Sequence, residues 1–136
     1  MMEIEIKSPC EDLEGMERRL RARGAAFHGE VSQVDLYLSH PCRDFARTDE
    51  ALRLREEGGR VTLFYKGPKL DPGSKTREEL SVAVPDPAAM RSILDRLGFR
   101  PVAEVRKTRR NFGLGPVEVS LDRVAGLSGY VELEIQ

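Results

Sequence analysis

The chain has 136 residues, of which 40% are hydrophobic and 33% are charged, and its formal net charge is −1. This length fits one domain, and the balanced charge gives no reason to expect general attraction to nucleic acid or to a membrane surface. No apolar run approaches the roughly 20 residues of a membrane span, and charges begin at Glu3, so we expect a cytoplasmic protein without a signal peptide.

The first half of the chain alternates charged and apolar residues on both sides of one helix. Residues 3–7 place charges at every second position, a period that is typical of a strand. Alone, this pattern fits an ordinary surface strand better than a site. Leu13, Met16 and Leu20 then have helical spacing, and Gly24 is placed to end the helix. Asp12, or a capping box of Ser8 with Glu11, would begin this helix, and further strands are predicted over residues 31–39, 52–55 and 61–66.

The second half has the same order of elements. A strand over residues 77–84 precedes Asp86-Pro87, which favours a helix start because aspartate caps and proline suits the first turn. The helix would bury a stripe of four residues and end at Gly98; the stripe is Met90, Ile93, Leu94 and Leu97. Strands follow through residues 105–109, 117–122 and 131–135.

An offset of 74 residues aligns the two halves on their caps and core positions. The matches are Glu5 with Glu79, Asp12 with Asp86, Met16 with Met90, Leu20 with Leu94, Gly24 with Gly98, Glu30 with Glu104 and Val31 with Val105. We infer two similar β-α-β-β halves related by an approximate two-fold. The expected fold class is α+β, mainly antiparallel β, with about eight strands and two helices packed outside them.

The polar faces of the strands carry equal numbers of acids and bases. If they line an interior, each charge needs a partner or a ligand, because burying a charge costs on the order of several kcal/mol. A polyphosphate with divalent cations uses both signs, since arginine and lysine contact phosphate and carboxylates hold Mg²⁺ or Mn²⁺. The acids are Glu3, Glu5, Asp35, Glu79, Asp122, Glu132 and Glu134, and the bases are Lys7, Arg53, Arg55, Lys66, Arg77, Lys107 and Arg109.

Other site chemistries have less support. Cys10 and Cys42, with only His28 and His40, form no pattern typical of a metal site, and we interpret both cysteines as reduced structural thiols. No glycine-rich loop of the P-loop type is present, so phosphate recognition would rest on side chains.

The order and spacing of these residues resemble the CYTH superfamily, named for class IV adenylyl cyclase and thiamine triphosphatase. Glu3-Ile4-Glu5-Ile6-Lys7 is similar to its ExExK motif, and the segment from Arg43 to Arg55 resembles the cyclase group most. The resemblance covers the chain through Gln33-x-Asp35-x-Tyr37, Arg43-Asp44-Phe45-Ala46, Leu52-Arg53-Leu54-Arg55, Tyr65-Lys66-Gly67, Thr76-Arg77-Glu78-Glu79, Lys107-x-Arg109, Leu121-Asp122 and Glu132-x-Glu134.

The resemblance implies a triphosphate tunnel, which is a closed or nearly closed eight-stranded barrel that binds a triphosphate and Mg²⁺ or Mn²⁺ inside. By matching position, the metal ligands are Glu3, Glu5, Asp122, Glu132 and Glu134. The phosphate ligands are Lys7, Arg53, Arg55, Lys66, Arg77, Lys107 and Arg109, with Lys7 also the candidate general base. Glu79 would orient a neighbouring arginine, and Asp35 and Tyr37 are either structural or in contact with substrate.

Three functions remain open. The first is a class IV adenylyl cyclase-like enzyme that converts ATP to cyclic AMP and pyrophosphate, and the second is a triphosphatase acting on inorganic, thiamine or nucleoside triphosphate. The third is a polyphosphate- or nucleotide-binding module without turnover. Family members usually continue for some tens of residues, so residues 1–136 form a single domain that either lacks this extension or is completed by a partner. Homodimers are common in the family, but no distinctive interface stripe supports one in this sequence.

Overall fold

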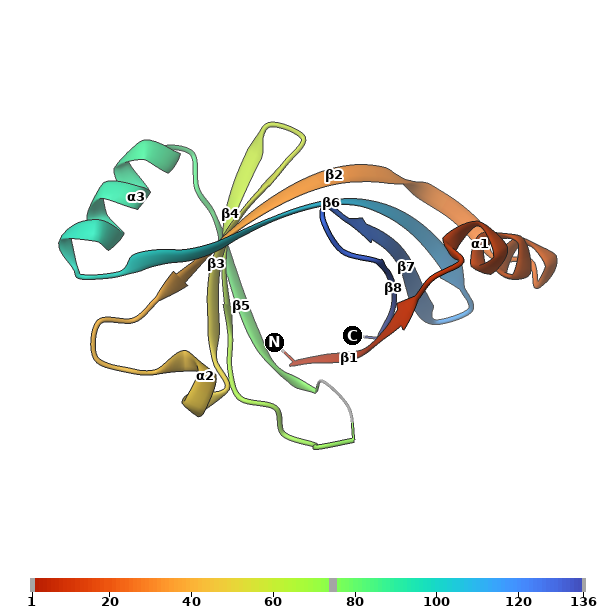
Figure 1. Ribbon diagram of the computed structural model, residues 1–136, viewed down its shortest axis with the longest axis horizontal. Coiled ribbons are helices and arrows are strands. Elements are labelled where there is room, and N and C mark those ends of the chain that lie inside the picture. Colours follow the sequence, from red (N-terminus) through yellow and green to blue (C-terminus); the bar gives the residue numbers. More distant parts are fainter. Residues whose placement is uncertain (1, 74–75, 136) are drawn as a thin grey trace.

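The strands of this protein form a closed antiparallel barrel. The computed structural model describes residues 2–73 and 76–135, and the side chains of residues 4–73 and 76–135. Within these residues the strand order is β1-β5-β4-β3-β2-β6-β7-β8, with β8 returning to β1 (Figure 1). The strands are β1 (Met2–Cys10), β2 (Ala26–Ser39), β3 (Ala51–Glu57), β4 (Arg60–Lys66), β5 (Arg77–Ala83), β6 (Arg100–Leu114), β7 (Val117–Val124) and β8 (Gly129–Ile135). The predicted eight-stranded barrel is therefore confirmed.

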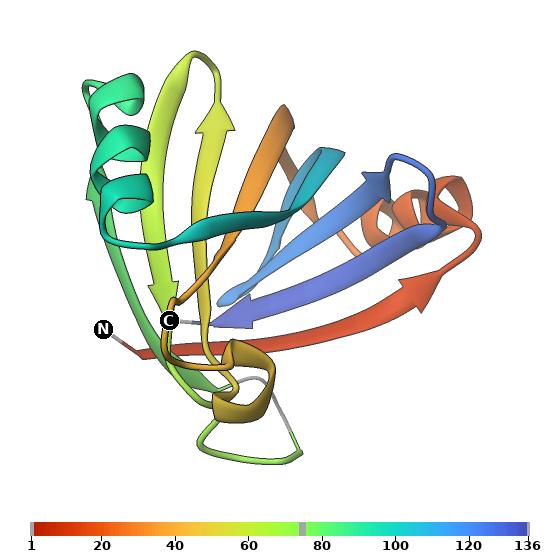
Figure 2. The same ribbon diagram turned by 60° about the vertical axis from the view of Figure 1, so that its left-hand side comes forward.

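Closure of the barrel is uneven. β2 and β6 are long and pair along almost their whole lengths, whereas β1 and β5 pair only at Met2 with Glu78 and Glu3 with Arg77. Figure 2 shows β1 and β8, the first and last strands, lying side by side. The barrel therefore closes through a short contact that leaves its interior open toward one side.

Two helices of equal length lie outside the barrel, as expected, and each begins at an aspartate. These are α1 (Leu13–Ala22) and α3 (Pro87–Arg96), at opposite ends of the molecule (Figure 1). The carboxylate of Asp12 accepts a hydrogen bond from the Gly15 amide at 2.9 Å, and that of Asp86 accepts from the Ala89 amide at 3.0 Å. Such contacts satisfy amides that have no partner within the helix. Asp12, rather than the Ser8 box, is the cap of α1.

A short third helix, α2 (Phe45–Thr48), lies between the strands that the sequence predicts over residues 31–39 and 52–55. Asp44 caps it, and Asp49 ends it with a left-handed backbone at φ 57°. One turn is too short to show a hydrophobic period, so the sequence pattern gave no signal for it. Within the described residues, no helix has the length and apolar character needed to cross a membrane.

Each long helix covers its own hydrophobic cluster. α1 packs Leu13 and Leu20 onto Phe112 of β6, whereas α3 packs Leu94 onto Leu38 and Leu54. The expected four-residue stripe of α3 is wrong in two places, because Ile93 is 55% exposed and Leu97 is 63% exposed. Met90 and Leu94 lie four residues apart on one helix face, and only this narrow face meets the curved sheet.

The two halves are related as the sequence offset predicts. α1 and α3 begin 74 residues apart, as do β2 and β6. Gln33 pairs with Lys107 in the β2–β6 ladder and Glu3 pairs with Arg77 in the β1–β5 ladder, and each pair is again 74 residues apart. A pseudo-two-fold axis therefore passes between the members of both pairs and through the barrel interior. Positions that this axis relates are called equivalent below.

Candidate substrate and metal site

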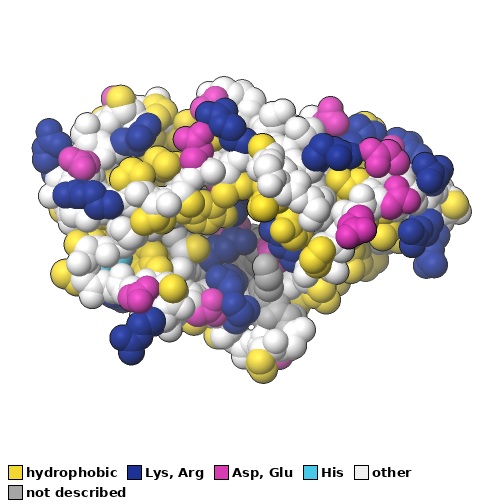
Figure 3. Space-filling model, viewed as in Figure 1, with side chains coloured by type: hydrophobic (Ala, Val, Ile, Leu, Met, Phe, Trp, Pro, Cys, Tyr) yellow, Lys and Arg dark blue, Asp and Glu magenta, His cyan; other side chains and the backbone are white. Residues whose placement is uncertain are grey.

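The barrel encloses a charged cavity of about 360 Å³. Figure 3 shows it as a hollow in one face of the molecule, with Lys and Arg side chains inside it. All of its lining residues except Tyr37, Ala51 and Phe64 are charged. The charged ones are Glu5, Lys7, Arg53, Arg55, Lys66, Arg77, Glu79, Lys107, Arg109, Glu132 and Glu134.

The cavity brings together most of the site predicted from the sequence. All seven expected phosphate ligands line it, together with the expected metal ligands Glu5, Glu132 and Glu134. Asp122 is buried beside the cavity and does not line it. Glu3 pairs with Arg77 through its backbone, but its side chain lies outside the described residues.

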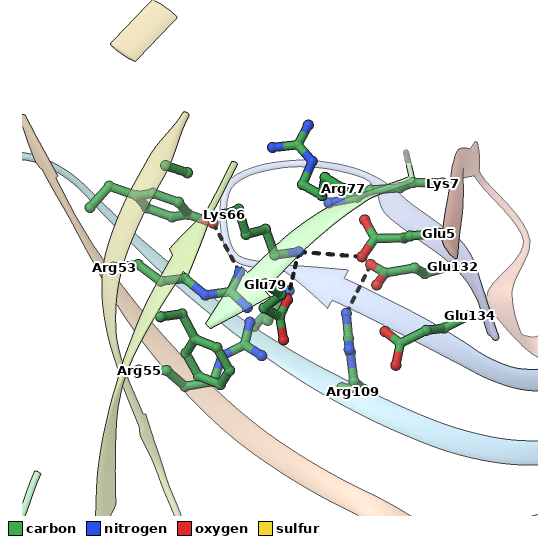
Figure 4. Close-up of a pocket in the computed structure, with 14 residues that line it drawn as sticks. Glu5, Lys7, Arg53, Arg55, Lys66, Arg77, Glu79, Arg109, Glu132 and Glu134 are labelled. Carbon is green, nitrogen blue, oxygen red and sulfur yellow. Dashed lines mark hydrogen bonds and ion pairs between the residues drawn. The ribbon is translucent and has the colours of Figure 1, made fainter. Parts of the chain in front are cut away.

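The two sides of the cavity carry opposite charges. Arg55 of β3 pairs with Asp35, and at the equivalent position Asp122 of β7 pairs with Arg109. Another equivalent pair is Lys66 of β4 and Glu134 of β8. The β3–β5 side is therefore mainly basic, although Glu79 lies on β5, and the β7–β8–β1 side is mainly acidic, although Lys7 lies on β1. Figure 4 shows Arg53 and Arg55 facing the glutamates across the cavity.

Three glutamates meet on the acidic side. Carboxylate oxygens of Glu5, Glu132 and Glu134 lie within 4.8 Å of one another, and Glu5 and Glu132 are each only 6% exposed. Burial, together with the neighbouring Glu5 carboxylate, raises the pKa of Glu132, although Arg109 opposes this shift. A buried like-charged cluster is unfavourable without a cation, and carboxylate oxygens are the ligands that Mg²⁺ and Mn²⁺ prefer. The cluster therefore fits a divalent cation.

Two buried ion pairs form the floor of the cavity. Arg55 donates two hydrogen bonds to Asp35, at 2.7 and 2.8 Å, and Arg109 does the same to Asp122 at the same two distances. Burial opposes ionisation of both aspartates, but the guanidinium hydrogen bonds hold the pKa of each below its usual value. Asp35 and Asp122 therefore stay charged and fix the two arginines.

Lys107 lies between these pairs, beside the pseudo-two-fold axis. Its ammonium nitrogen is 3.6 Å from Asp122 Oδ2, and its side chain is 8% exposed. Burial and the nearby Arg109 lower the pKa of Lys107 to about 8, although Asp122 opposes the shift. This lysine can change its charge within an ordinary assay range, unlike the arginines around it.

Arg53 on the basic side is held more weakly than Arg55. Its Nη1 lies 3.5 Å from the Tyr37 hydroxyl and 3.9 Å from Asp35 Oδ2, and its Nε is buried with no hydrogen-bond partner. A buried donor without a partner is costly.

Lys66 and Arg77 also line the cavity, and each lies near an acid. Lys66 reaches across the cavity, and its ammonium lies 3.4 Å from Glu5 and 3.5 Å from Glu79. We expected Glu79 to orient an arginine, whereas this contact is with a lysine. Arg77 is 3.6 Å from Asp49, which also binds Lys69 at 2.8 Å. Asp49 thus links α2 and the chain after β4 to the cavity rim.

Lys7, the candidate base, lines the cavity but is exposed. Its ammonium lies 5.0 Å from the centre of the Tyr130 ring. This position is at the mouth of the cavity, beside Glu132, with which Lys7 pairs across the β1–β8 ladder. The sequence did not single out Tyr130, because an isolated tyrosine near a strand start carries no distinctive pattern.

Comparisons with known proteins agree on one family. A family model described as the CYTH domain matches residues 1–136. A relative from Methanocaldococcus jannaschii, named "Putative adenylate cyclase", is 42% identical over 98% of this chain and 77% of its own length. "Adenylate cyclase CyaB" from Aeromonas hydrophila is 29% identical over 98% of this chain and 68% of its own. The solved structure of the PH1819 protein from Pyrococcus horikoshii OT3 superposes with a TM-score of 0.88, at 39% identity over 98% of this chain and 77% of that one.

Proposed function

Because this chain belongs to the CYTH domain family, we propose that it is a metal-dependent enzyme acting on a triphosphate held inside the barrel. The observation that carries the proposal is the opposition of a basic and an acidic side across one cavity. A triphosphate with its cation is a ligand that engages both sides at once.

The basic side would bind the phosphate oxygens. Arg55 is fixed by Asp35 and lines the cavity, and Arg53, whose polar contacts are long, lines it beside Arg55. Arg109 and Lys107 would contact the chain from the floor. Since these groups are already in place, binding needs little rearrangement, which is the condition for strong electrostatic stabilisation of a transition state.

The acidic side would hold the cation through Glu5, Glu132 and Glu134, with Glu3 as a further candidate and Asp122 as a positioning residue for Arg109. A bound Mg²⁺ or Mn²⁺ would neutralise phosphate charge and polarise the reacting oxygen. Lys7 lines the mouth of the cavity and remains the candidate general base.

An adenylyl cyclase-like reaction is the first candidate. In it, the ribose 3′-hydroxyl attacks the α-phosphorus of ATP, its proton passes to the base, and pyrophosphate leaves with the electron pair of the broken P–O bond. The support is the name given to both curated relatives.

Triphosphate hydrolysis is the second candidate, and the cavity lining favours it. The lining residues without charge are Tyr37, Ala51 and Phe64, and they offer few apolar contacts to a nucleobase. A bare or small organic triphosphate needs only the phosphate and metal contacts. Water would then attack the terminal phosphorus and release orthophosphate.

Phosphorus NMR of the products distinguishes the two reactions. The protein is incubated with ATP and with inorganic triphosphate, each with Mg²⁺ and with Mn²⁺, beside an Arg55→Ala control. Cyclic AMP with pyrophosphate identifies the cyclase, and orthophosphate identifies the hydrolase.

Arg55→Ala should weaken triphosphate binding by about 2 kcal/mol or more. No product in any sample, or full activity of the variant, contradicts the proposal.

A further inference from the structure

We propose that Phe64 is a positioning residue of the triphosphate site. Its ring holds the guanidinium groups of Arg53 and Arg55 in place without neutralising their charge. The inference rests on the proposed function, because it assigns Phe64 a role in the basic side of that site. A residue without a charge or a polar group is an unexpected choice inside a cavity of this composition.

The aromatic ring is in contact with both arginines. Phe64 of β4 pairs directly with Arg53 of β3, and its side chain lines the cavity. Its ring centroid lies 4.8 Å from the guanidinium carbon of Arg53 and 5.6 Å from that of Arg55. Both distances are within the range at which the negative face of an aromatic ring attracts a cation.

Arg53 depends on this ring more than Arg55 does. Asp35 is engaged by two short hydrogen bonds from Arg55 and lies 3.9 Å from Arg53, which is beyond hydrogen-bond distance. The other polar contact of Arg53 is at 3.5 Å, to the hydroxyl of Tyr37. The ring of Phe64 is thus the contact that fixes the plane of the Arg53 guanidinium while its Nε stays without a partner.

The equivalent position in the second half shows what an acid would do there. Phe64 pairs with Ser81 in the β4–β5 ladder, and Glu132 pairs with Lys7 in the β8–β1 ladder, so the pseudo-two-fold relates Phe64 to Glu132. Glu132 accepts a hydrogen bond from Arg109 at 3.1 Å. Asp35 occupies the position equivalent to Arg109, so in the first half the arginine opposite position 64 is Arg53, its direct partner in the β3–β4 ladder. A carboxylate at position 64 would engage Arg53 and compete with phosphate, whereas the ring has no net charge and leaves the donors available.

The test measures binding of sodium triphosphate by calorimetry in EDTA, where metal-dependent turnover is absent. Phe64→Leu should weaken binding by about tenfold, equal to ~1.4 kcal/mol, and Phe64→Trp should stay within about threefold of the parent because it keeps the aromatic face. Phe64→Glu should lose more than Phe64→Leu. In steady-state assays Phe64→Leu should raise KM with little change in kcat.

Arg53→Ala separates this inference from the proposed function. If Arg53→Ala loses affinity and Phe64→Leu does not, the positioning role of Phe64 is wrong and the site stands. If Arg53→Ala and Arg55→Ala also bind normally, the basic side does not bind the triphosphate and the proposed function is contradicted. If circular dichroism shows that Phe64→Leu does not fold, Phe64→Met, of similar volume, takes its place. Normal triphosphate affinity of Phe64→Met would overturn the inference in the same way.

Discussion

At the scale of single residues, the negative charge of Glu132 is unfavourable in the folded protein without metal. Its carboxyl is buried beside Glu5, and its pKa is raised by both effects. The folded state therefore keeps a proton that the unfolded state has released, so stability falls as pH rises from the unfolded pKa of about 4.3 through the raised folded pKa.

Replacing Glu132 by glutamine should remove that cost. The glutamine side chain would keep an oxygen to accept the Arg109 hydrogen bond, so we expect Glu132→Gln to raise Tm at pH 7 in EDTA by a few degrees, which corresponds to about 1 kcal/mol. The same variant should lose the rise in Tm that Mn²⁺ gives the parent protein. The matched control is Glu14→Gln, an exposed acid of α1 that pairs with Arg123. A parent protein whose Tm does not respond to Mn²⁺ would contradict the metal assignment.

Lys107 should make triphosphate binding depend on pH. Its lowered pKa of about 8 means that the free protein loses this positive charge as pH rises through that value. We expect triphosphate affinity, measured by calorimetry in EDTA, to fall between pH 7 and 9. Lys107→Arg stays charged over this range and should flatten the profile. A parent profile that is already flat would show that Lys107 does not contact the ligand.

At the scale of elements, the sequence predicted most of what the structure contains. Period-two alternation located the strands, Asp12 and Asp86 marked both long helices, and the 74-residue offset indicated the pseudo-two-fold. Burial on α3 was overestimated, because helical spacing identifies an apolar face but not how much of it a curved sheet covers.

This difference on α3 gives a direct test of how the helix packs. Leu94 is 8% exposed and Leu97 is 63% exposed. Leu94→Ala should destabilise the protein by roughly 2–5 kcal/mol, because it leaves a cavity in the cluster with Leu38 and Leu54. Leu97→Ala should stay within about 0.5 kcal/mol of the parent. Urea unfolding measures both, and equal losses would mean that α3 packs through a wider face.

At the scale of the whole molecule, the list of site residues could be predicted but their arrangement could not. Strand patterns placed acids and bases on the inner faces, but which side each occupies depends on pairing across the barrel. Asp122 illustrates the gap, since its motif suggested a metal ligand and its neighbours are Arg109 and Lys107. Phe64 carried no site signal in the sequence, because an aromatic residue in a strand is typical of ordinary packing; its role is indicated by its contacts with Arg53 and Arg55.

The pseudo-two-fold explains how one cavity comes to have a basic side and an acidic side. Both halves supply the same backbone positions, and β3 and β4 carry the bases Arg55 and Lys66 where β7 and β8 carry the acids Asp122 and Glu134. We therefore expect phosphate and cation to occupy the two sides together.

A crystal structure with Mn²⁺ and an unreactive triphosphate analogue, located by the anomalous scattering of manganese, tests this expectation most directly. We predict a manganese peak bonded to Glu5, Glu132 and Glu134, with phosphate oxygens between it and the guanidinium groups of Arg53 and Arg55. Manganese bound elsewhere, or an analogue bound outside the barrel, would contradict the account.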